Sequence, residues 1–243
     1  MPEQLPFTAL LNRLFGGMAH SLLQALGIRH FAQAPITNAV AMQFLVFLIL
    51  VLLFVYLRLR LSVDRPGGLQ HIFEGLQGFI DGQSREIIGH HSEKYTAFLS
   101  ALFLYILACN LIGLVPSLES PTGVPSVPLG CAIVAFLYYN FHGIKTQGPI
   151  HYAAHFAGPV PWLAPLMIPI EIISHLARVL SLTIRLTANI FAGDLVTLVF
   201  FSLIPIAVPV VFLGLHIFVS FLQAYIFVLL TTVYVSGAVA QEH

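Results

Sequence analysis

Long apolar segments constrain this chain more than any other feature. Residues 40–57, 95–115 and 127–141 form three apolar runs, and each is closed by a polar or proline-containing stretch. A helix that crosses a bilayer needs about 20 apolar residues, so the first two runs are long enough and the third is shorter. Hydrophobic residues make up 58% of the chain and charged residues only 8%. The sequence therefore predicts a polytopic helical membrane protein.

The last two apolar segments are longer than a perpendicular crossing requires. They cover residues 169–201 and 206–238, so their helices must tilt strongly or lie partly along the membrane. The joining stretch FSLIPIAVP contains two prolines, which cannot continue a helix but fit its first turn. We expect an all-α fold with about five membrane helices, the last two forming a long, tilted antiparallel hairpin that reverses near Pro205.

The other parts of the chain are less apolar. Residues 1–37 form an amphipathic segment that we expect outside the membrane, and no signal-peptide cleavage site is visible. Residues 38–243 then form a single membrane domain, with its polar hairpin at 165–240. Between the first two spans, residues 66–92 have the sparse apolar pattern of a surface helix, with apolar positions at Leu69, Ile72, Phe73, Leu76, Phe79 and Ile80.

Basic residues in the loops predict the orientation. The stretch 58–94 holds five basic residues, whereas the loop 116–126 holds none. Short loops rich in Lys and Arg stay in the cytoplasm, so the first of these faces inward. Alternation from there puts the N-terminus outside, the turn near Pro205 outside and the C-terminus inside.

The fourth long segment carries polar residues at membrane depth: Glu171, His175, Arg178, Arg185, Asn189 and Asp194. A charge at this depth is costly and is usually kept for function. At about 100° per residue, the first five fall in one stripe about 80° wide, and Asp194 points to the opposite side. Because helical pairs meet at three or four residues, a spacing of nine excludes an Arg185–Asp194 ion pair within the helix.

The two arginines of this segment favour different interpretations. Arg178 has Glu171 nearby, which favours local pairing close to a helix end, where long side chains reach the headgroups. Arg185 lies in the middle of the segment, a turn or more from any carboxylate in its own helix. An unpaired buried guanidinium is costly, so we predict that the partner of Arg185 is on another chain.

A second polar stripe follows in the last segment, where five residues share one helical face: His216, Ser220, Gln223, Thr231 and Tyr234. Such a stripe should face protein or water rather than lipid. Asp194 and His216 are each eleven residues from Pro205, so folding the hairpin there brings them to similar depth as a candidate acid–imidazole pair.

The same register predicts two polar clusters. Gln223 comes level with the region of Arg185 and Asn189, while Tyr234 comes level with Glu171 and His175. Two polar clusters offset around a fixed positive charge describe two half-channels that do not connect. A continuous pore would contradict this hypothesis.

These residues also carry a family resemblance. The stretches SLTIRLTANIFAGDLV and LQAYIFVLLTTVYVSGAVAQEH resemble the two signature regions of subunit a of F-type ATP synthases. EKYTAFLSALFLYILACNLIGLVP, the polar PT that follows and HYAAHFAGP occur in the order that this family shows, so the resemblance covers about residues 35–243. It implies that Arg185 is the essential stator arginine, with Glu171 in one half-channel and a proton path in the other at Asn189, Asp194, His216 and Gln223. The family often has Glu where Asp194 stands.

The resemblance also implies binding partners and a cellular location. The partners would be a ring of c subunits, each with one membrane carboxylate, the b subunits of the peripheral stalk and the rest of the complex, in an energy-transducing membrane such as the bacterial inner membrane. Arg185 would favour the ionised rotor carboxylate, so that a proton leaves toward one half-channel and another arrives from the other. No cofactor or metal is implied, and the chain lacks the GxxxxGK[ST] pattern of an ATP site.

Other function classes fit less well. A haem carrier needs two facing axial ligands, and the two deep histidines, His175 and His216, fall at different depths. An intramembrane protease lacks an HExxH helix, and Ser236 has no persuasive partner. A secondary transporter usually shows repeated halves, which are not visible. Balanced charges, ten basic and ten acidic, give no lead to nucleic acid, and Cys109 and Cys131 are interpreted as packing residues.

Overall fold

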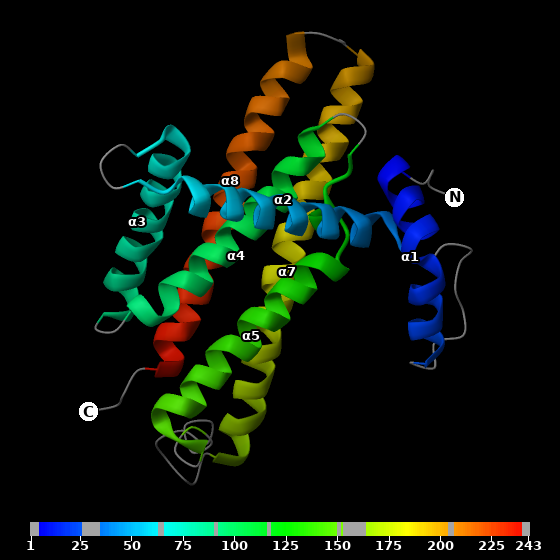
Figure 1. The fold of residues 1–243 in the computed structure, drawn as a ribbon. Helices are drawn as coiled ribbons and strands as arrows, with labels where there is room; N and C mark the ends of the chain where they lie inside the picture. Colours follow the sequence, from blue (N-terminus) through cyan, green and yellow to red (C-terminus); the bar gives the residue numbers. More distant parts are fainter. Residues whose placement is uncertain are drawn as a thin grey trace.

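Every element described by the computed structural model is helical (Figure 1). The structure describes residues 5–25, 35–62, 66–89, 92–115, 118–149, 152, 164–203 and 207–239. Within these ranges, five helices are long and apolar enough to cross a membrane. They are α2 (Asn38–Arg60), α4 (Glu93–Leu111, continued by the 3-10 turn η1, Ile112–Leu114), α5 (Ser126–Gln147), α7 (Ala164–Leu203) and α8 (Ala207–Val239). The predicted all-α fold with five spans is confirmed.

The third span is longer than its apolar run predicts. The run 127–141 is short, but α5 continues through His142 and Lys145 to Gln147 and spans 22 residues. Polar side chains do not stop a helix, and α5 ends only at Gly148, whose φ of 83° lies in the left-handed region that glycine adopts readily. The apolar run therefore underestimates this helix by about two turns.

α7 and α8 form the predicted antiparallel hairpin (Figure 1). With 40 residues, α7 is roughly 60 Å long, about twice the thickness of a bilayer's hydrocarbon core. α2 crosses this hairpin at a steep angle in Figure 1, so α2 and the hairpin cannot both be perpendicular to one membrane plane. At least one of the two must therefore be strongly tilted. The predicted turn residue Pro205 lies outside the described residues, between the end of α7 and the start of α8.

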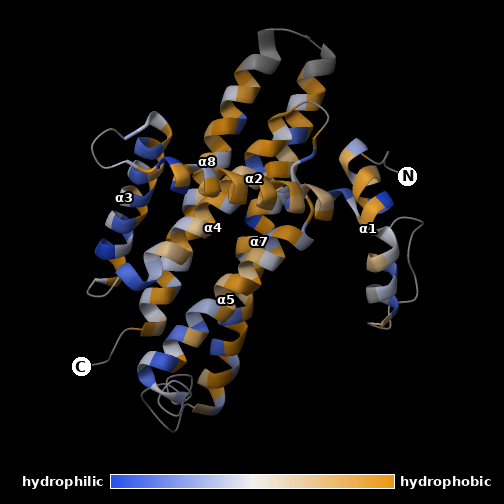
Figure 2. Cartoon of the chain, viewed as in Figure 1, coloured by the Kyte–Doolittle hydropathy of each residue, from blue (hydrophilic) through white to orange (hydrophobic). Residues whose placement is uncertain are grey.

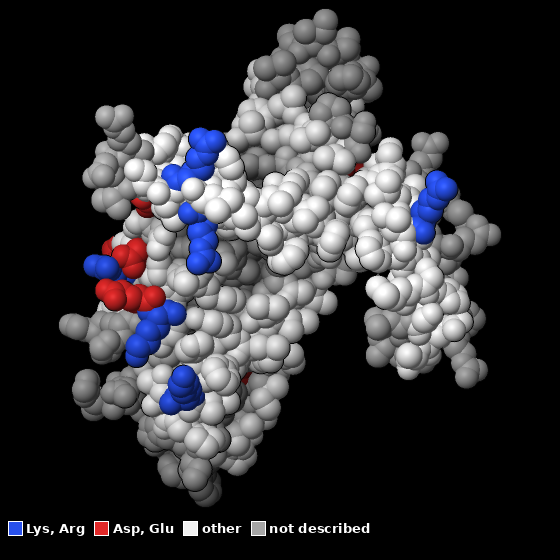
Figure 3. Space-filling view, in the orientation of Figure 1, with Lys and Arg blue, Asp and Glu red and all other residues white. Residues whose placement is uncertain are grey.

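The predicted surface helix is α3 (Gly68–Ile88), which packs on α4 and α8. Its Ile80 is buried in the core, whereas Leu69, Ile72 and Phe79 are exposed. Ser236 of α8 donates a hydrogen bond of 2.9 Å to the carbonyl oxygen of Ile87. α3 is more polar than the membrane helices (Figure 2), and charged side chains of both signs gather over it and its junction with α4 (Figure 3).

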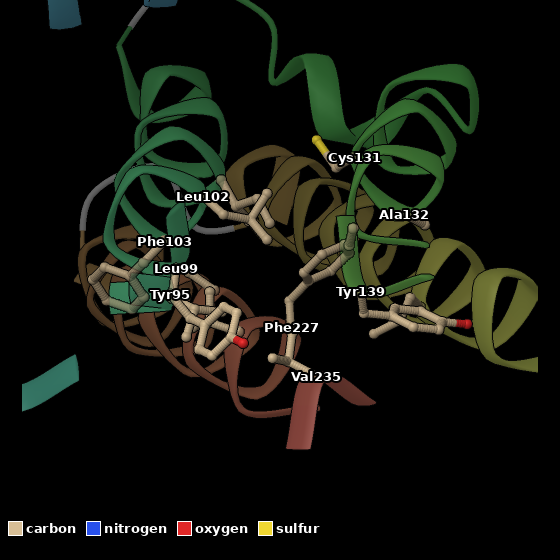
Figure 4. Packing of buried hydrophobic residues seen from close by; sticks show 14 of the residues in the cluster. Tyr95, Leu99, Leu102, Phe103, Cys131, Ala132, Tyr139, Phe227 and Val235 are labelled. Atoms are coloured by element: carbon tan, nitrogen blue, oxygen red, sulfur yellow. The ribbon is translucent and has the colours of Figure 1, made fainter. Parts of the chain in front are cut away.

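A continuous apolar core joins α4, α5, α7 and α8. Figure 4 shows part of this core, to which Leu99 and Phe103 of α4 and Phe227 and Val235 of α8 belong. The ring of Tyr139 extends from α5 toward α7 in the same view. Because α7 packs on both α5 and α8, the side chains on its packed face are held against these two helices.

The first helix, α1 (Pro6–Ala25), lies to one side of the bundle and packs on α2 (Figure 1). The side chain of Asn12 forms two hydrogen bonds of 3.0 Å with the backbone of Ile36, one to its carbonyl oxygen and one from its N–H. These bonds hold α1 against the start of α2, where Thr37 caps the helix by accepting from the N–H of Val40.

Candidate functional site

Asp194 and His216 meet across the hairpin, at the depth that the register predicts. Asp194 Oδ1 lies 3.8 Å from His216 Nδ1. The imidazole is buried at 6% exposure, whereas the carboxylate side chain is 48% exposed. Gly193 makes this approach possible, because a Cβ there would lie 3.1 Å from His216 Nδ1. The A-G-D stretch of α7 thus provides both the acid and the space for its partner.

Two cavities adjoin this pair. One, of about 380 Å³, lies between α7 and α8 and is lined by Asn189 and Gln223. The other, of about 500 Å³, is lined by Asp194 and by the residues around the 3-10 turn η2 (Pro121–Gly123). His216 lines both cavities, and its Nε2 is buried without a hydrogen-bond partner among the described residues. The imidazole therefore stands between two spaces that can hold water.

A buried polar network fixes the wall of the second cavity. Asn110 of α4 donates a hydrogen bond of 3.2 Å to the carbonyl oxygen of Ser220 on α8. Its own amide oxygen accepts a bond of 2.7 Å from Thr122, whose hydroxyl lies 2.8 Å from that of Ser120. Ser120 in turn donates to the carbonyl oxygen of Cys109. The network ties η2 to α4 and α8 beside His216.

A second polar cluster lies toward the start of α7; we call it the Glu171 cluster, and it comprises Glu171, His175, Arg178, Tyr139 and Tyr234. His175 Nδ1 and the Tyr139 hydroxyl share a hydrogen bond of 2.7 Å, and His175 Nε2 lies 3.4 Å from Glu171. These side chains line a cavity of about 110 Å³ with Tyr152. A phenol, an imidazole and a carboxylate in contact form a chain that can pass a proton.

Arg178 belongs to this cluster by direct contact. Its guanidinium lies 4.0 Å from Glu171 and 5.0 Å from the centre of the Tyr234 ring. The prediction of a local pair with Glu171 is confirmed, and the cation–π contact with Tyr234 is an addition from α8. Tyr152 lies outside the spanning helices at the same end, and burial raises the pKa of its phenol.

Arg185 lies between the two clusters and differs from Arg178. It is half-buried, and within the part of the chain that the structure describes it forms no ion pair or hydrogen bond. It comes 14 residues after Glu171 and nine before Asp194, roughly 21 Å and 13 Å along the helix. The side chains at 182, 186 and 190 pack into the core, while Arg185 lies at the edge of the exposed face.

Several of these site residues were not predicted from the sequence. Asn110 lies in the apolar run 95–115, Ser120 and Thr122 lie in the loop 116–126, and Tyr139 lies in the apolar run 127–141. An asparagine inside an apolar membrane run was a signal for the first group, because a buried amide needs partners. Nothing in the pattern of 127–141 distinguishes Tyr139 from a packing residue, since its role depends on contact with His175.

Most of the chain is similar to one family of known proteins. Residues 40–236 match the model of the family described as ATP synthase A chain. The chain belongs to this family. A relative named ATP synthase subunit a in Koribacter versatilis (strain Ellin345) is 53% identical over 244 residues, covering 100% of both chains. Another of that name in Solibacter usitatus (strain Ellin6076) is 57% identical over 234 residues, covering 96% of this chain and 100% of the relative.

More distantly related members of the family are still similar over most of the chain. One in Helicobacter pylori (strain Shi470), also named ATP synthase subunit a, is 44% identical over 178 residues, covering 73% of this chain and 79% of the relative. The resemblance stated from the signature stretches is confirmed. Family membership and the five apolar helices together make this chain a multi-pass membrane protein.

Proposed function

We propose that this chain is the proton-conducting stator subunit of the Fo sector of an F-type ATP synthase. Two offset half-channels lead protons to and from carboxylates on a rotor ring of c subunits, and Arg185 separates them. The observation that carries the proposal is the position of Arg185, without an ion-pair partner among the described residues and between two polar clusters on one helix. Its relatives are named as subunits of ATP synthase.

The surface beside Arg185 fits a rotor helix. Four small residues of α7 are exposed on the side next to it: Ala177, Ser181, Ala188 and Ala192. Small residues let membrane helices approach closely, and Ile184 and Phe191 on the same exposed side are apolar. A carboxylate on a passing helix would come into reach of the guanidinium there, which favours the ionised form and drives release of its proton.

The polar clusters at Asp194 and at Glu171 would form the two routes by which protons reach and leave the rotor. In the first, Asp194, His216, Asn189, Gln223 and Ser220 line or adjoin the two cavities at one end of the hairpin. In the second, Glu171, His175 and Tyr234 belong to the Glu171 cluster at the other end. A charge that falls through a membrane potential yields roughly 2.3 kcal/mol per 100 mV, so several steps must combine for each ATP made elsewhere in the complex.

The orientation and the assembly belong to the same proposal. The chain sits in the bacterial inner membrane with its N-terminus outside and its C-terminus inside, because the basic loop 58–94 faces the cytoplasm. The Asp194 end of the hairpin then faces the side from which protons flow during synthesis. The b subunits of the peripheral stalk hold the chain still while the ring turns.

ATP-driven acidification of inverted vesicles that carry the assembled complex tests the proposal. We expect Arg185→Ala to abolish acidification, because no fixed charge then separates the half-channels. Arg58→Ala is the matched control, since Arg58 is exposed at the end of α2 and should pump like wild type. Wild-type pumping by Arg185→Ala would refute the assignment.

A further inference from the structure

We propose that Glu119 is the outermost proton-collecting acid of the half-channel that contains Asp194. This inference rests on the proposed function and adds to it a residue from outside the hairpin. Glu119 precedes η2, in the loop that carries no basic residue, and it shares the cavity of about 500 Å³ with Asp194 and His216. No other acidic side chain of the described residues lines that cavity.

Exposure orders the three titratable groups from the outside inward. Glu119 is exposed, the side chain of Asp194 is 48% exposed, and that of His216 only 6%. A proton that binds Glu119 from solvent can therefore pass through water in the cavity to Asp194 and then to the imidazole. The cavity is far larger than the roughly 30 Å³ that one water molecule takes up in the liquid.

The unsatisfied Nε2 of His216 is independent evidence that the adjoining cavities hold a polar ligand. Its Nε2 is buried and has no hydrogen-bond partner among the described residues, while its Nδ1 faces Asp194. Buried polar atoms are almost always satisfied, so the free nitrogen calls for water or a proton donor in the adjoining spaces. Water that enters the cavity at its mouth, beside Glu119, can supply this hydrogen-bond partner.

The position of Glu119 is held from two directions. Asn38, the first residue of α2, donates a hydrogen bond of 3.4 Å to Glu119 Oε2. On the other side, Ser120 is fixed by its bonds to Thr122 and to the carbonyl oxygen of Cys109. The neighbouring η2 faces the acid of α7, since a Cβ on Gly123 would lie 4.0 Å from Asp194 Oδ2. The loop thus keeps Glu119 at the mouth.

The charges around the cavity favour proton collection. No lysine or arginine of the described residues lines it, so Glu119 and Asp194 give it a negative potential. A cleft of one charge sign with apolar walls concentrates ions of the opposite sign and speeds their arrival. Leu114, Leu118 and Leu198 supply such walls here.

The test measures proton flow in liposomes that contain the whole complex, driven in the synthesis direction by a potassium diffusion potential at equal pH on both sides. The lumen, from which protons flow, holds a membrane-impermeant buffer at low or high concentration. At low buffer we expect Glu119→Gln to slow the initial rate about tenfold, the lower end of the gain that a charged cleft gives to an association rate. High buffer should restore the rate, because buffer molecules then deliver the protons.

Matched variants make the result specific. Glu119→Asp keeps the carboxylate and should stay close to wild type, and Glu86→Gln removes an exposed acid of α3 far from the cavity and should have no effect. A wild-type rate for Glu119→Gln at low buffer would overturn the inference. A slow rate that high buffer fails to restore would also overturn it, because a structural defect behaves in that way. Arg185→Ala in the same liposomes tests the proposed function separately.

Discussion

His216 Nδ1 lies 3.8 Å from Asp194 Oδ1, across a hairpin in which 21 residues separate them along the chain. The pair joins an exposed acid to a buried imidazole between two cavities. Its geometry depends on three local features: the register of α7 and α8, the missing Cβ at Gly193 and the nearby network around Asn110. The last two of these features can each be changed by a single substitution.

Removing the charge of Asp194 should slow proton uptake without abolishing it. Asp194→Asn keeps the shape and some hydrogen bonding but cannot carry a proton as an acid. The loss should stay below the roughly 100-fold that a positioned acid or base contributes, because water in the open cavity can partly replace it. ATP-driven pumping measures the effect, with Glu86→Gln at an exposed position of α3 as control. Full activity of Asp194→Asn would remove the acid from the path.

Filling the space at Gly193 should disturb the imidazole. Gly193→Ala adds a Cβ only 3.1 Å from His216 Nδ1, so the ring must move by a few tenths of an ångström, which changes its approach to Asp194. We expect slower pumping although alanine is the better helix former. Gly214→Ala is the matched control, because a Cβ there meets no atom within 4 Å. Equal rates for the two variants would show that the close approach has no role.

The network around Asn110 should matter for stability. Thr122→Val removes the hydroxyl that donates to the Asn110 amide oxygen and leaves a buried acceptor unsatisfied, at a cost of about 1–3 kcal/mol. Thr231→Val should cost less, since that hydroxyl only shares a carbonyl of its own helix. Thermal unfolding of the purified complex in detergent compares the two variants. A larger loss for Thr231→Val would contradict the importance of the network.

The hydroxyl of Tyr139 should take part in proton transfer through the Glu171 cluster. Tyr139→Phe removes the hydroxyl that lies 2.7 Å from His175 Nδ1, and the proton chain from Glu171 loses its third member. Pumping should fall, while Tyr138→Phe should not change it, because the Tyr138 ring stacks on Phe98 and its hydroxyl makes no hydrogen bond with the described residues. If both variants pump equally well, Tyr139 serves packing alone.

The sequence predicted most of the fold because a membrane helix requires a long run of apolar residues, which is visible in the sequence. It also predicted the pairing of Asp194 with His216, since both positions follow from counting residues to the turn. It underestimated α5, whose last residues are polar yet helical. It missed Asn110, Thr122 and Tyr139, because their roles arise from contacts between α4, α5, η2 and the hairpin that periodicity within one helix does not contain.

The most direct test of the account is passive proton flux through complexes stripped of the soluble head, with the rotor cross-linked to the stator so that the ring cannot turn. Locked wild-type complexes should conduct no protons, because Arg185 keeps the half-channels apart. Locked Arg185→Ala complexes should conduct, since a proton can then pass from one half-channel to the other through a stationary rotor carboxylate. If the locked Arg185→Ala complexes are as tight as wild type, Arg185 is not the barrier between two half-channels and the central claim is wrong.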